Sequence, residues 1–265
     1  MILRNILMLM SLWLVLNSTG ALAVDVNREL WMAAREGDLS GVKSAIISGA
    51  DVNSANAQGK TALMGAVRYG NKDVVQYLLV EGAELESADK KGYTALMQAA
   101  IDGRPEMFGL LHLHGVNINH QATDGTTALM QAAWSGQVEI ARQLLINGAD
   151  TRLSRKDGLT ALHHAANFGY EEVVAQLLAY GADPNAQSTA GVTPLMSAAF
   201  YNNQGIAELL IAKGADILAE SKNGLTALAN AQLGRHDEMA DFLTEQQEEA
   251  EAAAKEKAAA EQQQQ

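Results

Sequence analysis

Three histidines, His112, His114 and His120, fall within one short segment and are the first candidates for chemistry. Imidazole nitrogen is a common metal ligand, so the segment could hold an ion. If the segment is helical, however, the side chains of His112 and His114 point about 200° apart and cannot share one ion unless the helix end unwinds. In the internal period of the chain, the positions equivalent to His112 are occupied by Leu79 and Leu145. We therefore favour a packed structural histidine and keep a metal site as the alternative.

Two short motifs resemble parts of enzymes, but neither is complete. Gly59-Lys60-Thr61 ends like a phosphate-binding loop, which also requires a glycine five residues earlier, where Ser54 stands. Ser40 and Lys43 have the Ser-x-x-Lys spacing of penicillin-recognising enzymes, without the Lys-Thr-Gly segment that accompanies it. No nucleophile, base and orienting group recur together. The sequence thus predicts neither an enzyme nor a cofactor.

A strict internal period accounts for most of the chain. Glycine recurs at positions 59, 92, 125, 158, 191 and 224, and each is followed by one variable residue and then Thr-Ala-Leu or Thr-Pro-Leu. A second glycine series keeps the same constant step at positions 49, 82, 115, 148, 181 and 214. Two series locked at one period without an insertion indicate stacked structural units.

The chain resembles the ankyrin-repeat family from Leu30 to about Leu243. The units follow the family's order of Gly-x-Thr-x-Leu, an alanine pair, a glycine near the middle, a Leu-Leu pair and Gly-Ala-Asp, with departures in single units, and the unit from Gly125 to Asp150 is typical. The resemblance implies an all-α solenoid of stacked helix-turn-helix units with hairpin loops. Seven units, including two caps, would start near residues 26, 59, 92, 125, 158, 191 and 224 of a domain spanning 24–246.

Individual residues agree with this arrangement. Gly125 stands where a hairpin tip needs a positive φ, and Thr127 is placed to cap the first helix of its unit. Ala132-Ala133 and its equivalents let neighbouring units approach closely. In four units methionine replaces the family's histidine, so we expect softer units in which a thioether fills space without the hydrogen bonds of histidine. These methionines are Met64, Met97, Met130 and Met196.

The first 23 residues have the organisation of a secretory signal peptide. Arg4 provides the positive start, residues 6–16 are predominantly apolar, and Ala21-Leu22-Ala23 is a small-x-small cleavage site. A membrane anchor would need about 17 to 25 apolar residues, and this stretch is only eleven residues long. Because the chain also has no cysteine, a lipoprotein anchor is excluded. We expect cleavage after Ala23 and a periplasmic or secreted bacterial protein with no stable membrane anchor.

The composition is acidic. Nineteen Lys and Arg against 31 Asp and Glu give a net charge of −12, or −13 once Arg4 is lost. This charge disfavours nucleic acid as a partner. Residues 247–265 form a charged tail rich in Ala, Glu and Gln, which predicts a solvated helical extension of the last unit. The tail lacks the apolar heptads of a coiled coil, and we expect a monomer.

The positions that bind partners in this family are the hairpin tips and the solvent-facing end of the first helix, because stacking does not need them. Here these positions carry cations in the early units and aromatic residues in the later ones. We predict a protein-binding groove formed by Lys60, Arg68, Tyr69, Lys90, Lys91, Tyr93, Trp134, Phe168, Phe200 and Tyr201. A partner with an acidic patch beside an apolar one would suit it. The alternative is that the rings only thicken the core and the lysines are solvated tips.

These features together predict an exported, non-enzymatic scaffold that binds another protein through its concave face. One alternative is an inhibitor or immunity protein that blocks a toxin or enzyme in the same compartment. Another is an accessory protein that binds a metal or small ligand for an enzyme through His112 and His120.

Overall fold

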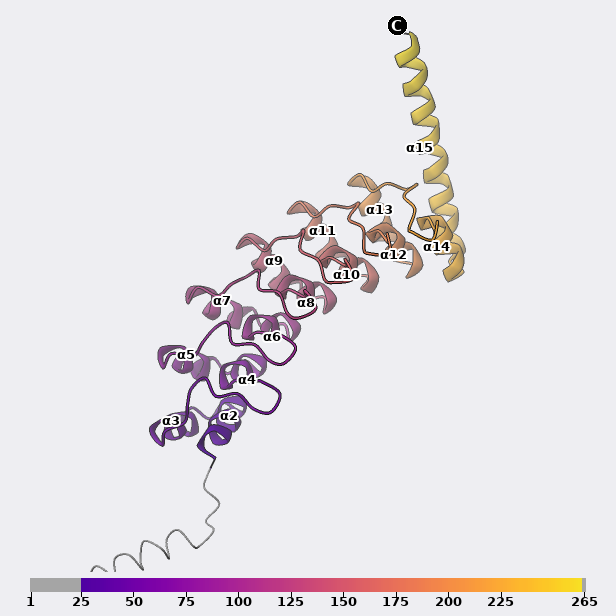
Figure 1. Ribbon diagram of the computed structural model, residues 1–265. Helices are drawn as coiled ribbons and strands as arrows, with labels where there is room; N and C mark the ends of the chain where they lie inside the picture. Colours follow the sequence, from indigo (N-terminus) through magenta and orange to yellow (C-terminus); the bar gives the residue numbers. More distant parts are fainter. Residues whose placement is uncertain (1–24, 264–265) are drawn as a thin grey trace, which may run out of the picture.

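The computed structural model describes residues 25–263, which form a curved stack of helix pairs followed by one long helix (Figure 1). Within these residues the fold is all-helical, with two isolated antiparallel bridges as its sheet-like pairings. The predicted solenoid of helix-turn-helix units is therefore confirmed. The signal peptide predicted at residues 1–23 lies outside the described residues.

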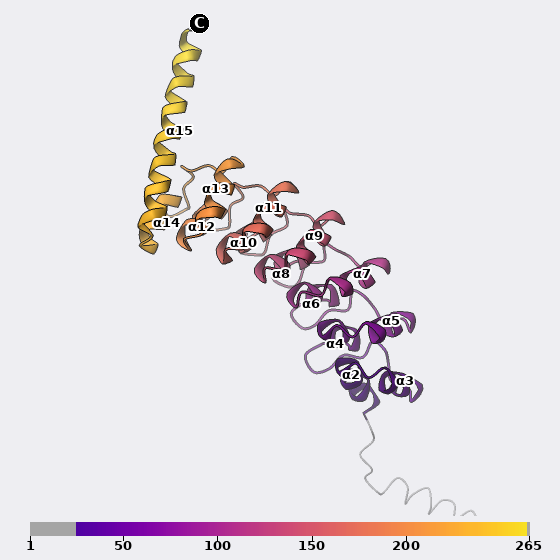
Figure 2. The ribbon, with the colours of Figure 1, turned by 180° about the vertical axis from the view of Figure 1, so that it is seen from behind.

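Each repeat contributes an inner and an outer helix. The inner helices are α2 (Val26–Glu36), α4 (Ala62–Tyr69), α6 (Ala95–Ile101), α8 (Ala128–Trp134), α10 (Ala161–Phe168), α12 (Pro194–Phe200) and α14 (Ala227–Gly234). The outer helices are α3 (Leu39–Ile47), α5 (Lys72–Val80), α7 (Pro105–Leu113), α9 (Val138–Ile146), α11 (Glu171–Ala179), α13 (Gln204–Ala212) and the first turns of α15 (Asp237–Gln263). The inner helices and hairpins lie on the inside of the bend, called the concave face below, and the outer helices lie on its outside (Figures 1 and 2).

Local backbone requirements set where the inner helices begin. Thr127 precedes α8 in an extended conformation, and its hydroxyl accepts a hydrogen bond from the Met130 N–H at 3.2 Å. This bond satisfies one of the free N–H groups at the helix start. At the hairpins that precede the inner helices, glycine is required for two reasons, a positive φ and a close approach of the next hairpin. Gly92 has a φ of +83°, and a Cβ there would lie 2.6 Å from the backbone nitrogen of Thr123 in the next hairpin.

The core runs through the stack as one continuous layer between inner and outer helices. Both alanines of each central pair, such as Ala132-Ala133, are fully buried. Side chains of this size allow neighbouring inner helices to pack closely, whereas larger ones would push the repeats apart. The leucine pairs of the outer helices close the layer from the other side, with Leu144 among the fully buried side chains. No repeat covers its own apolar surface, so the stack folds as a unit.

Side-chain amides also join successive repeats through hydrogen bonds, in addition to the apolar core. Asn71, just before α5, donates from Nδ2 to the carbonyls of Ala34 and Arg35 at the end of α2, the inner helix of the previous repeat, at 2.8 and 2.9 Å. Asn203 does the same for Ala166 at 2.7 Å. The last turn of a helix leaves carbonyls without partners. These amides satisfy them from the neighbouring repeat.

The final helix, α15, belongs to the stack only at its start. Met239 and Leu243 are fully buried against the last repeat. Beyond them the helix continues without a break to Gln263 and extends away from the stack (Figure 1). The predicted boundary between residues 246 and 247 therefore falls inside one continuous helix. Ion pairing between Lys255 and Glu251, one turn apart at 3.7 Å, is typical of an exposed helical segment.

Candidate functional site

The inner helices present one side chain per repeat at an equivalent position near their C-terminal ends. We call this set the groove row. Its members, which follow the internal period of the chain, are Arg35, Arg68, Ile101, Trp134, Asn167, Phe200 and Leu233. The row is cationic in the first two repeats and mainly apolar from the third onwards. The predicted groove residues Arg68, Trp134 and Phe200 belong to it.

Aromatic rings from neighbouring repeats meet in the apolar half. Trp134 and Phe168 are 44% and 47% exposed, and their ring centres lie 5.1 Å apart. Phe200 and Tyr201 form an edge-to-face pair with centres 5.1 Å apart. Such offset and edge arrangements are the favourable ones for aromatic pairs. Each ring thus leans on a neighbour and still leaves about half of its surface to solvent, which combines the two alternatives drawn from the sequence.

Leu233 extends this apolar half by one repeat and was missed by the sequence prediction. Its side chain is 61% exposed, and it stands one full period after Phe200. The internal period alone would have been sufficient to predict this residue. Tyr93 behaves differently from the other predicted rings, because it is half-buried and packs against the core. Its hydroxyl accepts a hydrogen bond from Gln131 Nε2 at 3.3 Å.

Aromatic rings also contact the arginines in the cationic half of the groove row. The Arg35 guanidinium carbon lies 5.6 Å from the ring centre of Trp31 and 5.8 Å from that of Tyr69. The Arg68 guanidinium carbon also lies 5.8 Å from the Tyr69 ring centre, and Arg68 Nε is 3.9 Å from the Asp102 carboxylate. Cation–π contacts of this kind hold an arginine in place without neutralising its charge.

The predicted basic residues separate into two groups. Lys60 and Arg68, together with Arg35, line a hollow of about 280 Å³ on the concave face. Lys90 and Lys91 do not line this hollow and lie exposed at the tip of the next hairpin. Arg35 was missed because the first repeat lacks the Gly-x-Thr hairpin and was interpreted only as a cap.

The middle of the concave face holds a charged network beside Trp134. Arg155 Nη2 lies 3.4 Å from the Asp157 carboxylate and 3.7 Å from that of Asp124. A hollow of about 320 Å³ is lined by Arg155 and Asp124 and also by Trp134 and His164. Burial, assisted by the positive charge of Arg155, lowers the pKa of His164 to about 4. His164 is therefore neutral at physiological pH and packs against the Trp134 ring at 4.9 Å.

His163, next to His164, forms hydrogen bonds that join the start of its helix to the hairpin of the next repeat. Its Nδ1 accepts a hydrogen bond from the Thr160 N–H at 3.2 Å, and its Nε2 lies 2.9 Å from the Val192 carbonyl of the next repeat. The expectation that methionine at this position forms no hydrogen bond is wrong for Met196. Its sulfur accepts a weak bond from the Thr193 N–H at 3.5 Å, because the flexible thioether reaches back over the helix start.

The three clustered histidines point to different neighbours. His112 stacks on Phe108 with ring centres 5.6 Å apart, but its side chain is exposed. The expectation of a packed histidine is therefore wrong, because the polar ring rests one face on Phe108 and stays in contact with water. His114 binds a backbone carbonyl of its own helix, and His120 lies 3.4 Å from the Glu86 carboxylate. Within residues 25–263, no three His, Cys, Asp or Glu side chains gather as a metal site would require.

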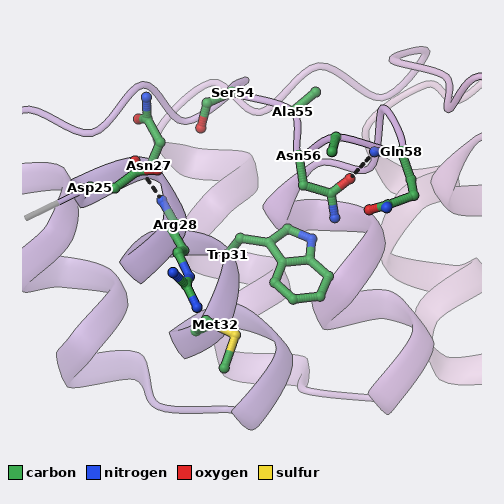
Figure 3. Close-up of a pocket in the computed structure, with 10 residues that line it drawn as sticks. Asp25, Asn27, Arg28, Trp31, Met32, Ser54, Ala55, Asn56 and Gln58 are labelled. Carbon is green, nitrogen blue, oxygen red and sulfur yellow. Dashed lines mark hydrogen bonds between the residues drawn. The ribbon is translucent and has the colours of Figure 1, made fainter.

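A further hollow, of about 470 Å³, lies beside the first repeat (Figure 3). Figure 3 shows the Trp31 indole facing the loop that carries Asn56 and Gln58. Within this loop the Asn56 side-chain oxygen accepts a hydrogen bond from the Gln58 N–H at 2.9 Å. Trp31, Asn56 and Gln58 also line the hollow that holds Arg35 and Lys60, so they form the wall between the two spaces.

A row of exposed aliphatic side chains on the outer helices was also missed. It consists of Ile47, Val80, Leu113 and Ile146, each the last residue of its helix and one period from the next. The row lies on the opposite side of the stack from the groove row. The sequence could have shown this row, because its apolar residues recur with the same period at a position that stacking does not use.

Comparison with known proteins places the repeats in a family. The family model for ankyrin repeats, described as three copies, matches residues 30–122, 105–188, 129–221 and 184–256. These matches overlap and together span nearly all of the described chain. A search of curated proteins found no match. Among the helices of residues 25–263, none combines the length and apolar character needed to cross a membrane.

Proposed function

Because the chain belongs to the ankyrin-repeat family, whose repeats generally bind other proteins and are typically non-catalytic, we propose that it is an exported scaffold that holds a partner protein on its concave face. The observation that carries the proposal is the row of half-exposed rings formed by Trp134, Phe168, Phe200 and Tyr201. Large apolar patches are uncommon on the free surface of soluble proteins and mark interaction sites.

The geometry of these rings suits an interface more than a core. Each ring is held by a neighbour, so little side-chain freedom remains to be lost when a partner covers it. Each also keeps a large apolar area that a partner can bury. Aromatic side chains that are rigid in the free protein are frequent hot spots of binding energy.

Export is the second part of the proposal. It is supported by the arrangement of Arg4, the apolar stretch of residues 6–16 and the small-x-small site ending at Ala23. N-terminal analysis of the exported protein by mass spectrometry tests it directly. A chain that begins at Val24 supports the proposal, whereas a chain that retains residues 12–16 indicates an anchor instead.

The binding surface is tested by site-specific photocrosslinking in the cells that export the protein. A photoreactive residue at Tyr201, on the concave face, should form an adduct with the partner. The same residue at Tyr180, which is also exposed but follows the outer helix α11, is the matched control. Trp134→Ala should abolish the adduct from position 201 while leaving the melting temperature nearly unchanged. Adducts from both positions, or a collapse of the melting temperature with normal crosslinking by the folded fraction, would refute the concave interface.

An inhibitor or immunity protein would use the same face, and identification of the crosslinked partner separates it from a scaffold. The metal-binding accessory has less support, because His112, His114 and His120 have different neighbours. We therefore keep the protein-binding function as the conclusion.

A further inference from the structure

Gly65 stands at a position where the fold does not require glycine. It lies in the middle of α4, outside the residues of positive φ. A Cβ built on it would come no closer than 3.9 Å to its nearest neighbour, Arg35, which is ordinary contact. The equivalent residues of the next three repeats are Gln98, Gln131 and His164. Because glycine inside a helix is destabilising relative to alanine, its presence here calls for another reason.

The effect of this glycine is to leave space between cations. Gly65 lines the hollow of about 280 Å³ together with Arg35, Lys60 and Arg68. A glutamine at this position, as in the next two repeats, would place an amide side chain beside these groups. The absence of a side chain at Gly65 therefore adds open space between the cations that line the hollow.

The cations around the hollow are only partly neutralised. Arg68 lies 3.9 Å from the Asp102 carboxylate. Within the described residues, no carboxylate comes within 4.0 Å of the charged nitrogens of Arg35 or Lys60. Arg35 is oriented by the rings of Trp31 and Tyr69 instead of by an acid. In a chain with a net charge of −12, a local excess of positive charge held in this way favours an anionic ligand.

We propose that this hollow binds a carboxylate side chain, Asp or Glu, of the partner protein. The inference rests on the proposed function, because it names the chemistry that the partner brings to the same concave face. Two guanidinium groups at equivalent positions of adjacent repeats offer planar donor forks, which match a carboxylate. Tyr69 and Trp31 provide apolar walls for the methylene groups that carry it.

The neighbouring charges favour one carboxylate over a polyanion. Next to Arg68 stands Asp102, and further along the face the two carboxylates of Asp124 and Asp157 share a single cation, Arg155, so negative charge is in excess there. A nucleic acid or polyphosphate lying along the groove would meet these acids, and like charges brought together in this way disfavour binding. The apolar part of the groove row begins at Ile101, one repeat beyond Arg68. The ligand that fits both parts is a peptide segment with an acidic residue followed by apolar ones.

The test uses a library of random peptides displayed on phage, selected on the mature full chain. We expect enriched peptides to carry Asp or Glu at a constant distance from apolar residues. Gly65→Gln should weaken their binding by about tenfold or more, because its side chain fills the space through which the carboxylate reaches the two arginines, and the ion pairs are then lost. Gly65→Ala is the matched control, since it removes the glycine but keeps most of the space, and it should bind within about twofold of the wild type. Both variants should fold, because Gln occupies this position in the next two repeats and Ala favours the helix.

The outcomes separate this inference from the proposed function. Peptides that lack a constant acidic residue, or that bind Gly65→Gln as well as the wild type, overturn the carboxylate site. If their binding still falls in Trp134→Ala, the concave interface stands. Enriched peptides that are insensitive to Trp134→Ala and also to Gly65→Gln overturn both. Displacement of acidic peptides by millimolar inorganic phosphate as readily as by millimolar glutamate would show a general anion site and refute the preference for a carboxylate.

Discussion

The side chain of Asn119 is bonded to the backbone of Asp150 in the next repeat: its Oδ1 accepts a hydrogen bond from the Asp150 N–H at 2.9 Å. Its Nδ2 donates to the nearby Gly148 carbonyl at 3.2 Å. The same two-sided contact recurs at Asn53 and Asn185. One side-chain amide thus donates a hydrogen bond to the backbone of the next repeat and accepts another from it.

Asn119→Ala should lower the free energy of unfolding by about 1 to 2 kcal/mol, because two hydrogen bonds between repeats are lost. Asn147→Ala is the matched control, since the Asn147 amide binds the Gln143 carbonyl of its own repeat. Urea unfolding followed by circular dichroism measures both. Equal losses in the two variants would contradict a role for Asn119 in joining repeats.

The buried His164 should make stability depend on pH. Its pKa is about 4 in the folded chain because of burial, with the charge on Arg155 acting in the same direction, and a histidine in the unfolded chain titrates near 6.5. Between these values the unfolded chain takes up a proton that the folded chain does not. The free energy of unfolding should therefore fall by roughly 2 to 3 kcal/mol as pH decreases from about 7 to 4.

His164→Gln should flatten this dependence, since glutamine occupies the equivalent positions 98 and 131. A smaller slope should persist because burial also lowers the pKa of His163. Urea midpoints measured between pH 7 and pH 4.5 provide the comparison. A variant whose slope matches the wild type would show that His164 is not the titrating group.

Met130→His should stabilise the fourth repeat. At the equivalent position, His163 binds both Thr160 and the Val192 carbonyl, and a histidine at 130 would face Thr127 and Leu159 in the same way. Each new hydrogen bond contributes about 1 kcal/mol, so the melting temperature should rise. Met130→Leu, which keeps the volume and adds no polar atom, is the control. A melting temperature for Met130→His below that of Met130→Leu would refute the prediction.

Leu144→Ala should cost about 2 to 5 kcal/mol, because the side chain is fully buried and its removal leaves a cavity in the central repeat. Deleting the chain from Gln247 onwards should cost far less, since the buried residues of α15, Met239 and Leu243, precede the cut. Urea unfolding of the two variants compares them. Similar losses would mean that the end of α15 packs on the stack.

The helices and their ends were predictable because they depend on requirements within one repeat. Thr127 and Gly125 each meet a local need of the backbone, a cap and a positive φ, and the period copies that need along the chain. The groove row was predictable in part for the same reason. Positions that stacking does not use stand out when they carry Trp134 or Phe200 instead of a polar residue.

Features that depend on relationships between repeats were missed. Asn119 has no equivalent in the adjacent repeats, where Glu86 and Arg152 stand, and asparagine returns at this position only in every second repeat, at Asn53 and Asn185. The hollow beside Arg35 could not be predicted, because its prediction depends on knowing that Gly65 has no steric reason to be glycine. Only the positions of the neighbouring atoms show this. His112 was expected inside because its equivalents are leucines, yet an imidazole can rest on Phe108 and keep its contact with water.

The change in character along the groove row removes an ambiguity that regular stacks create. On a lattice of identical repeats, a bound segment could shift by one repeat, or lie in the reverse direction, and find almost the same contacts. Here a shift would move an acidic group from Arg35 and Arg68 towards Ile101, and a reversal would carry it to Phe200 and Leu233. The irregular row therefore gives the otherwise periodic surface both an origin and a direction.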